Sequence, residues 1–154
     1  MTRVCLVGSE EVNLRYELVS RETAREALAT YDPSEPYENT VGVETISLGS
    51  AVALLNDLDW YLVRFADAAW VLEPSVSESE WLSRDLATAI RDDDVDPDES
   101  GRYLRMYGVV EADGTRRLVE PMFVARTGRS LPEYDLREVD DTLLVRVTEA
   151  EFGA

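Results

Sequence analysis

Residues 102–126 read RYLRMYGVVEADGTRRLVEPMFVAR, two runs rich in apolar and aromatic residues on either side of Asp113-Gly114. An Asp-Gly pair between two such runs is typical of the two-residue turn of a β-hairpin. The stretch therefore predicts strands over 102–111 and 116–126, with Ala112 opposite Thr115.

The predicted register gives the hairpin two faces, because successive residues of a strand point to opposite sides. One face carries large apolar side chains and is expected to pack on a core: Leu104, Met106, Val110, Val119 and Phe123. The other face mixes aromatic, charged and apolar side chains: Tyr103, Arg105, Tyr107 and Glu111, opposite Val124, Met122, Glu120 and Arg116. This second face is the candidate contact surface of the chain.

The hairpin region also differs from the rest of the chain in charge. Residues 101–131 hold six arginines and three acids, a local charge of +3 in a chain whose net charge is −17. Arginines interleaved with tyrosines can stack on a partner and form charged contacts with it. Tyr103, Arg105, Tyr107 and Arg116 are therefore the predicted partner-binding residues. The alternative is a solvated sheet face on which Arg116 forms an ion pair with Glu111 opposite it.

Before the hairpin, the sequence predicts a mixture of strands and helices. The apolar run at 3–7 indicates a buried strand. Residues 12–18 alternate between apolar and polar, which favours a strand, although a helix running on to Tyr31 is the alternative. Ser20 is the expected N-cap of a helix that carries Ala24, Ala27, Leu28 and Tyr31.

The middle of the chain predicts a strand over 41–48 and a short helix over 50–58. Residues 60–65 and 70–73 are expected to be two more strands, joined by a hairpin at 66–68. Three tryptophans, Trp60, Trp70 and Trp81, lie in largely apolar patterns, so packing in a core or at its edge is expected for them.

The clearest helical signal follows Ser77 and Glu80, which form a capping-box pattern, with Ser75 and Glu78 as a competing register. The helix behind them would bury Leu82, Leu86, Ala89 and Ile90. A last strand is expected over 142–147. We therefore expect one α+β domain over residues 1–154, a mainly antiparallel β-sheet with about three helices packed on it.

Composition points to the solvent in which the protein works. The chain has 154 residues, 32 acids and 15 basic residues, and every basic residue is arginine. At about 1 M salt the Debye length is roughly 3 Å, so repulsion among so many carboxylates is largely screened. We therefore expect a halophilic, acidic protein that works in a cytoplasm with molar salt. The N-terminal residues carry no apolar stretch typical of a signal peptide, and no apolar run is long enough to span a membrane, so we expect a soluble, cytoplasmic protein.

The chain lacks the residues that several common kinds of catalytic and metal-binding site require. The chain has no histidine and a single cysteine, Cys5, so a Ser-His pair, a Cys-His pair and a zinc site of the common types are excluded. We expect no cofactor and no tightly bound transition metal, and a buried structural role for Cys5. The acidic stretch 92–99 does not fit the EF-hand pattern, because no glycine and closing glutamate stand where that loop needs them. No catalytic residues are predicted.

Three segments carry a resemblance to a known family: 12–18 (VNLRYEL), 20–28 (SRETAREAL) and 81–86 (WLSRDL), together with the terminal 147–152 (VTEAEF). They look like those of a small, uncharacterised haloarchaeal protein family of unknown function. The resemblance covers most of the chain. It implies lineage and a cytoplasmic location, and it brings no catalytic residue.

Together these observations favour a non-enzymatic interaction or regulatory protein. It would bind a macromolecular partner, most readily a protein, through the Arg/Tyr face of the 102–126 hairpin. An RNA- or ribosome-associated factor that uses the same face is the first alternative. The second alternative is an enzyme that holds a small anion between arginines and carboxylates; a deep pocket with converging charges would favour it.

Overall fold

The computed structural model describes residues 1–153, and these form one seven-stranded sheet with helices on one side. The strands are β1 (Thr2–Gly8), β2 (Thr40–Thr45), β3 (Ala66–Leu72), β4 (Trp81–Ser83), β5 (Tyr103–Ala112), β6 (Thr115–Ala125) and β7 (Asp141–Arg146). The helices are α1 (Leu14–Val19), α2 (Glu22–Ala27), α3 (Leu48–Asp57), α4 (Asp59–Phe65) and α5 (Arg84–Arg91), with a 3-10 turn at Pro97–Glu99. The strand order is β2-β1-β3-β4-β7-β5-β6, and neighbours are antiparallel except β4 and β7.

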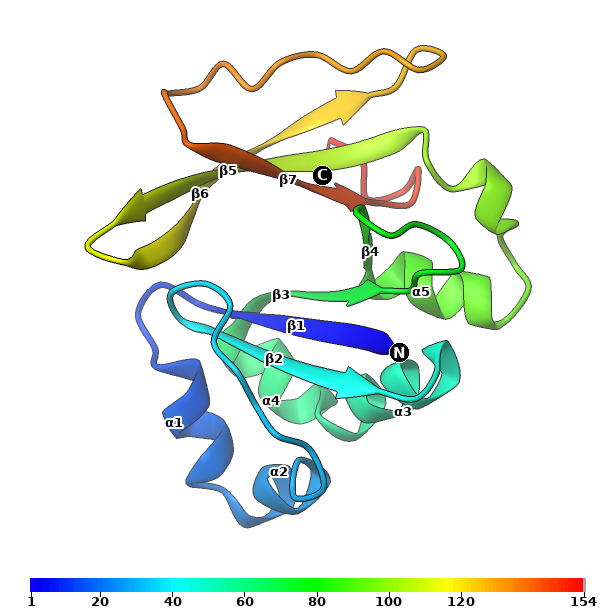
Figure 1. Ribbon diagram of the computed structural model, residues 1–154. Helices are drawn as coiled ribbons and strands as arrows, with labels where there is room; N and C mark the ends of the chain where they lie inside the picture. Colours follow the sequence, from blue (N-terminus) through cyan, green and yellow to red (C-terminus); the bar gives the residue numbers. More distant parts are fainter. Residues whose placement is uncertain (154) are drawn as a thin grey trace.

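The sheet folds over on itself, so that its two ends face each other (Figure 1). We call β2, β1 and β3 the first half-sheet and β7, β5 and β6 the second half-sheet. The three-residue strand β4 connects them, because it pairs with β3 on one side and with β7 on the other. Between the half-sheets lies an inner cluster of buried side chains: Cys5, Trp70, Tyr107, Val109, Leu143, Val145 and Val147.

The helices cover the outer face of the first half-sheet, where they form the largest core of the protein (Figure 1). Val4, Leu6 and Val71 of the sheet pack there with Leu55 of α3 and Leu86 of α5. Each of these side chains is at most 1 % exposed. A fully buried side chain of this kind contributes roughly 1.5–3 kcal/mol, so this layer carries most of the hydrophobic stabilisation.

The outer face of the second half-sheet has a different cover. Leu104, Met106 and Val124 are buried there against Leu131 and Tyr134 of the irregular segment 127–140. That segment runs along the strands on the side away from the helices (Figure 1). Both faces of β5 are thus buried, one in the inner cluster and one under this segment.

The fold class is confirmed: the structure is α+β, with a mostly antiparallel sheet. Residues 1–153 contain five α-helices where about three were expected. The predicted strand at 3–7 and the predicted helix at 50–58 are present as β1 and α3. Cys5 is fully buried, and burial raises the pKa of its thiol to about 12, so the thiol is protonated and structural.

The favoured strand over 12–18 is wrong, and the helical alternative describes this segment better. Asn13 caps α1 by accepting a hydrogen bond from the Tyr16 amide, and Leu14 and Leu18 share one buried helical face. The helix does not continue to residue 31. Ser20 ends α1 and caps no helix, since α2 begins after Arg21, which makes no side-chain cap.

The predicted strand over 60–65 is also wrong, because these residues form α4. Residues 66–68 make no hairpin. They begin β3, which continues into the strand expected at 70–73 and ends at Leu72. Trp60 is 49 % exposed and packs against the rings of Tyr61 and Phe65, so it lies at the edge of the core and not inside it.

The predicted helix cap at Ser77 is in the wrong place. Ser77 Oγ accepts hydrogen bonds from the amides of Ser79 and Glu80, but these close a turn rather than start a helix. The cap of α5 is Ser83, which accepts from the Leu86 amide. Leu82 belongs to β4. Among the described helices, none is long and apolar enough to cross a membrane.

Candidate functional site

The β5–β6 hairpin forms as predicted near its turn, but a β-bulge changes its register farther along. Pairs from Ala112–Thr115 to Gly108–Val119 follow the predicted register. Beyond them, Met106 pairs with Met122, so Tyr107 lies opposite two residues, Glu120 and Pro121. Proline lacks an amide N–H and is tolerated at bulges and on edge strands, and β6 is an edge strand.

The bulge moves β6 side chains to the other face, because a shift of one residue reverses the direction of every side chain beyond it. Phe123, predicted on the core face with Leu104, pairs instead with Arg105 and lies with the inner cluster. Met122 and Val124 take the opposite face, under segment 127–140. The predicted pairing of Tyr103 and Arg105 with these two residues is therefore wrong.

The predicted site residues Tyr103, Arg105 and Tyr107 point between the half-sheets instead of outward. Tyr107 is only 8 % exposed, and its ring lies 4.9 Å from that of Trp70. Burial raises the pKa of the Tyr107 phenol, which Arg105 opposes in part. Tyr103 packs farther along the strand, 4.8 Å from the ring of Phe152.

Arg105 lies half-buried beside Tyr107. Its guanidinium stacks over the ring of Phe123, 4.8 Å from the centroid, and its Nη1 donates a long hydrogen bond of 3.4 Å to Tyr107 Oη. Its Nε is buried and has no hydrogen-bond partner in the described part of the chain. A buried charged donor without an acceptor costs free energy. Packing against Phe123, more than hydrogen bonding, therefore holds the Arg105 side chain in this position.

Arg116, the fourth predicted residue, lies near the hairpin turn. It stands opposite Glu111 as predicted, but the ion pair that it forms is with Asp141 of β7, at 3.3 Å. Its guanidinium also lies 5.3 Å from the ring of Tyr37, and its carbonyl accepts from the Glu38 amide. Arg116 thus ties the second half-sheet to the loop before β2.

A cleft of about 660 Å³ opens between the half-sheets next to these residues. We call it the Arg–Tyr cleft. From the first half-sheet and its loops it is lined by Val7, Gly8, Glu10, Glu38, Asn39 and Asp67. From the second half-sheet and segment 127–140 it is lined by Arg105, Tyr107, Arg117, Leu118, Val119, Glu120, Pro121 and Arg137. Two of the four predicted residues, Arg105 and Tyr107, are thus brought together at one site.

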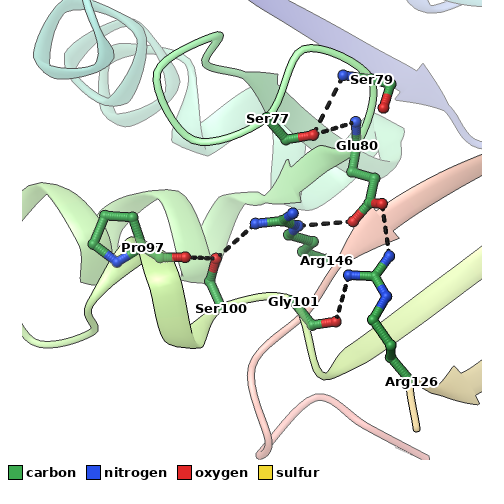
Figure 2. Close-up of polar contacts among 8 residues, drawn as sticks. All are labelled: Ser77, Ser79, Glu80, Pro97, Ser100, Gly101, Arg126 and Arg146. Atoms are coloured by element: carbon green, nitrogen blue, oxygen red, sulfur yellow. Dashed lines mark hydrogen bonds and ion pairs between the residues drawn. The ribbon is translucent and has the colours of Figure 1, made fainter. Parts of the chain in front are cut away.

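The remaining charges of the hairpin are partly used for structure. Glu80, before β4, accepts hydrogen bonds from Arg126 at 2.6 Å and from Arg146 at 2.8 Å (Figure 2). Arg146 also donates to Ser100 Oγ, and Arg126 to the carbonyl of Gly101. We call Glu80, Arg126 and Arg146 the ionic cluster. Their side chains are 14–20 % exposed, so they are largely withdrawn from solvent.

The cluster determines the charge state of Glu80. Burial alone would raise the pKa of this carboxyl group, but the hydrogen bonds and positive charges of Arg126 and Arg146 outweigh it and lower the pKa below its usual value. Glu80 is therefore ionised wherever the protein is folded near neutral pH.

Several residues of the cleft were missed by the sequence analysis. Glu10, Glu38, Asp67 and Arg137 stand in loops or at strand ends, where 32 acids give no single carboxylate a recognisable signal. The part of the chain that the structure describes contains no group of three or more Cys, Asp or Glu residues arranged to hold a metal ion.

A comparison with protein families finds one match. The model of a family of unknown function, DUF5804, matches residues 2–109. The chain belongs to this family. No curated protein and no solved structure matches it. The stretch of this DUF5804 member that matches contains the first half-sheet, β4 and most of β5, and with them Asp67, Arg105 and Tyr107. Arg117 and Arg137 lie beyond the matched residues.

Proposed function

We propose that this DUF5804 member is a non-enzymatic interaction or regulatory protein that binds a protein partner through the Arg/Tyr side of its β5–β6 hairpin, at the Arg–Tyr cleft. The observation that carries this proposal is Arg105. Its buried Nε has no acceptor within the described chain, and it lies on the wall of a cleft large enough for another molecule's side chains. A small shift of the side chain that turns Nε toward the cleft would let an acceptor from a partner satisfy it.

The cellular setting belongs to the same proposal. The haloarchaeal lineage is inferred only from the resemblance of the segments named above. A cytoplasm with molar salt is inferred from composition, since the net charge is −17 and arginine is the only basic residue type. In such salt, long-range attraction between exposed charges is screened, so contacts inside a cleft contribute more to binding than charges on an open surface.

The same cleft disfavours the RNA alternative. Glu10, Glu38, Asp67 and Glu120 line it, and these carboxylates would repel a phosphate backbone. The predicted stacking residue Tyr107 is packed against Trp70, so its ring is not presented to a base. A protein partner, which carries both charge signs, fits the lining better.

A small-ligand enzyme remains the second candidate, because arginines and carboxylates do converge on this cleft. Its volume of about 660 Å³ lies within the range of small-molecule sites. Turnover of a small anion would support this candidate against the interaction protein.

The test is a pull-down from a native lysate in molar KCl with the wild type, Arg105→Ser and Arg129→Ser. Arg129 is an exposed arginine of the same basic region and does not line the cleft, so it is the matched control. We expect a nuclease-resistant protein that the wild type and the control capture and Arg105→Ser loses. Equal capture by all three variants would refute the proposal, and nuclease-sensitive capture would favour RNA. Tyr107 is left intact, since its burial makes substitution destabilising.

A further inference from the structure

We propose that the Arg–Tyr cleft binds a zwitterionic group, with its anionic end at Arg105 and its cationic end at the acidic residues opposite. The inference rests on the proposed function, since it names the chemistry that the binding site recognises. It is carried by the distribution of charge across the cleft, which the following contacts define.

The wall formed by the second half-sheet is mainly basic. Arg105 and Arg117 of the strands line it together with Arg137 of segment 127–140, and Glu120 is its acid. Arg105 is the best positioned of the three for an anion. The ring of Phe123 supports one face of its guanidinium, Nη1 is engaged with Tyr107, and the Nε–H has no acceptor. The Nε and Nη2 edge of a guanidinium is suited to two parallel hydrogen bonds with a carboxylate, which a small shift of this side chain toward the cleft would permit.

The wall formed by the first half-sheet is acidic. Glu10, Glu38 and Asp67 line it, and no basic residue of that wall faces the cleft. Asp67 is close enough to Tyr107 for its charge to oppose ionisation of the phenol. This places a carboxylate of β3 on the side of the cleft across from Arg105.

The backbone around the acidic wall is held in place by hydrogen bonds. The Gly8 amide donates to the Asn39 carbonyl at 2.9 Å, and Asn39 Nδ2 donates to the Ser9 carbonyl at 2.9 Å. A Cβ on Gly8 would lie 2.6 Å from Asn39 Nδ2, so glycine is required for this close approach. The backbone that carries Glu10 and Glu38 is therefore held in place by the fold, and the carboxylates themselves are exposed.

The two walls do not neutralise each other. Among residues 1–153, no ion pair links Glu10, Glu38 or Asp67 to an arginine across the cleft. A simple anion at Arg105 would face the opposing carboxylates, and a simple cation at Asp67 would face the opposing guanidinium groups. A ligand with both charges meets an opposite charge at each wall, so it suits this lining better than either simple ion.

The test compares three probes of similar length: 6-aminohexanoate, hexanoate and hexylammonium. Binding is measured by calorimetry in the KCl concentration at which the protein is folded. We expect 6-aminohexanoate to bind at least about tenfold more tightly than either singly charged probe. A blocked Glu-Lys dipeptide, which carries the two charges on side chains, distinguishes a protein segment from a free small molecule as the source of the group.

Two variants test which wall of the cleft binds which charge of the ligand. Arg105→Ser should abolish binding of 6-aminohexanoate and hexanoate alike. Asp67→Asn should remove the advantage of 6-aminohexanoate over hexanoate and leave hexanoate binding unchanged or stronger. Arg129→Ser, the control outside the cleft, should bind as the wild type does.

The outcomes separate this inference from the proposed function. The zwitterion inference is wrong if hexanoate binds as tightly as 6-aminohexanoate, or if Asp67→Asn keeps the preference for 6-aminohexanoate. Neither result would contradict the proposed capture of a protein partner through Arg105. If none of the probes, the dipeptide included, binds, the inference is also wrong. Loss of partner capture by Arg105→Ser remains a separate result, because it is measured without any probe.

Discussion

The ionic cluster and the Arg–Tyr cleft both use arginines of the second half-sheet, but only the cluster satisfies them within the chain. Arg126 and Arg146 share the carboxylate of Glu80 and also bond to Gly101 and Ser100. Arg105 has an aromatic ring beneath it and a buried Nε–H without an acceptor. The difference separates the arginines that stabilise the fold from Arg105, the one that the proposed function assigns to a partner.

The physical reason is the cost of burial. A half-buried charge that finds its partners within the chain offsets its desolvation, whereas an unsatisfied one does not. Removing a partner from the cluster should therefore harm the fold, and removing Arg105 should harm binding.

The largest effect on stability is expected from Glu80→Gln. The amide keeps the size of the side chain but leaves Arg126 and Arg146 without a negative charge, which should destabilise the protein by about 2–3 kcal/mol. Urea denaturation in molar KCl measures this, as a lower midpoint with an unchanged slope. Glu78→Gln is the matched control, because Glu78 is exposed in the same turn. Equal midpoints for the two variants would show that the cluster is not a stabilising element.

Acid should reduce the contribution of the same carboxylate. The pKa of Glu80 is lowered in the folded protein, so the stability linked to its ionisation is fully present above the pKa of an unfolded glutamate, about 4.3. It is lost as the pH falls through the lower, folded-state value. The stability difference between the wild type and Glu80→Gln should therefore shrink below about pH 4. A difference that stays constant from pH 7 to pH 3 would contradict this.

The smallest effect on stability is expected from Arg105→Ser. Losing the stacking contact with Phe123 lowers the free energy of unfolding. Removing a buried donor that has no acceptor raises it, so the two effects oppose each other. The net change should lie within about 1 kcal/mol. Thermal melts in molar KCl measure it beside the binding assays. A loss as large as that of Glu80→Gln would mean that Arg105 is structural and that the comparison of the two sites fails.

The sequence predicted the hairpin well where local chemistry determines it. Asp113 and Gly114 both adopt positive φ, which the two-residue turn requires, so the register near the turn follows from two residues. The bulge at Glu120-Pro121 has no comparable signal beyond the proline itself. The bulge reverses the direction of the side chains beyond it. Without the bulge, the prediction placed Phe123 on the wrong face, so its contact with Arg105 was not predicted.

Other errors have a similar origin. Residues 12–18 alternate between apolar and polar, yet Leu14 and Leu18 also stand four apart, and the Asn13 cap favours the helix. The cleft itself could not be predicted from the sequence. It forms only because the sheet folds over and brings Asp67 of β3 opposite Arg105 of β5, and no local pattern encodes that approach.

The pairing of β4 with β7 also has a consequence for how the protein is made. Leu82 pairs with Arg146, which the ribosome adds 64 residues later. At 5–20 residues per second, a nascent chain waits about 3–13 s for that partner. Leu143 and Val145 of β7 pack in one cluster with Cys5 and Trp70, so before β7 is made this face of the first half-sheet lacks part of its cover. Apolar faces that are exposed during synthesis attract one another on neighbouring polysomes. Slow translation between β4 and β7, or a chaperone that covers Trp70, would lower the risk of co-translational aggregation.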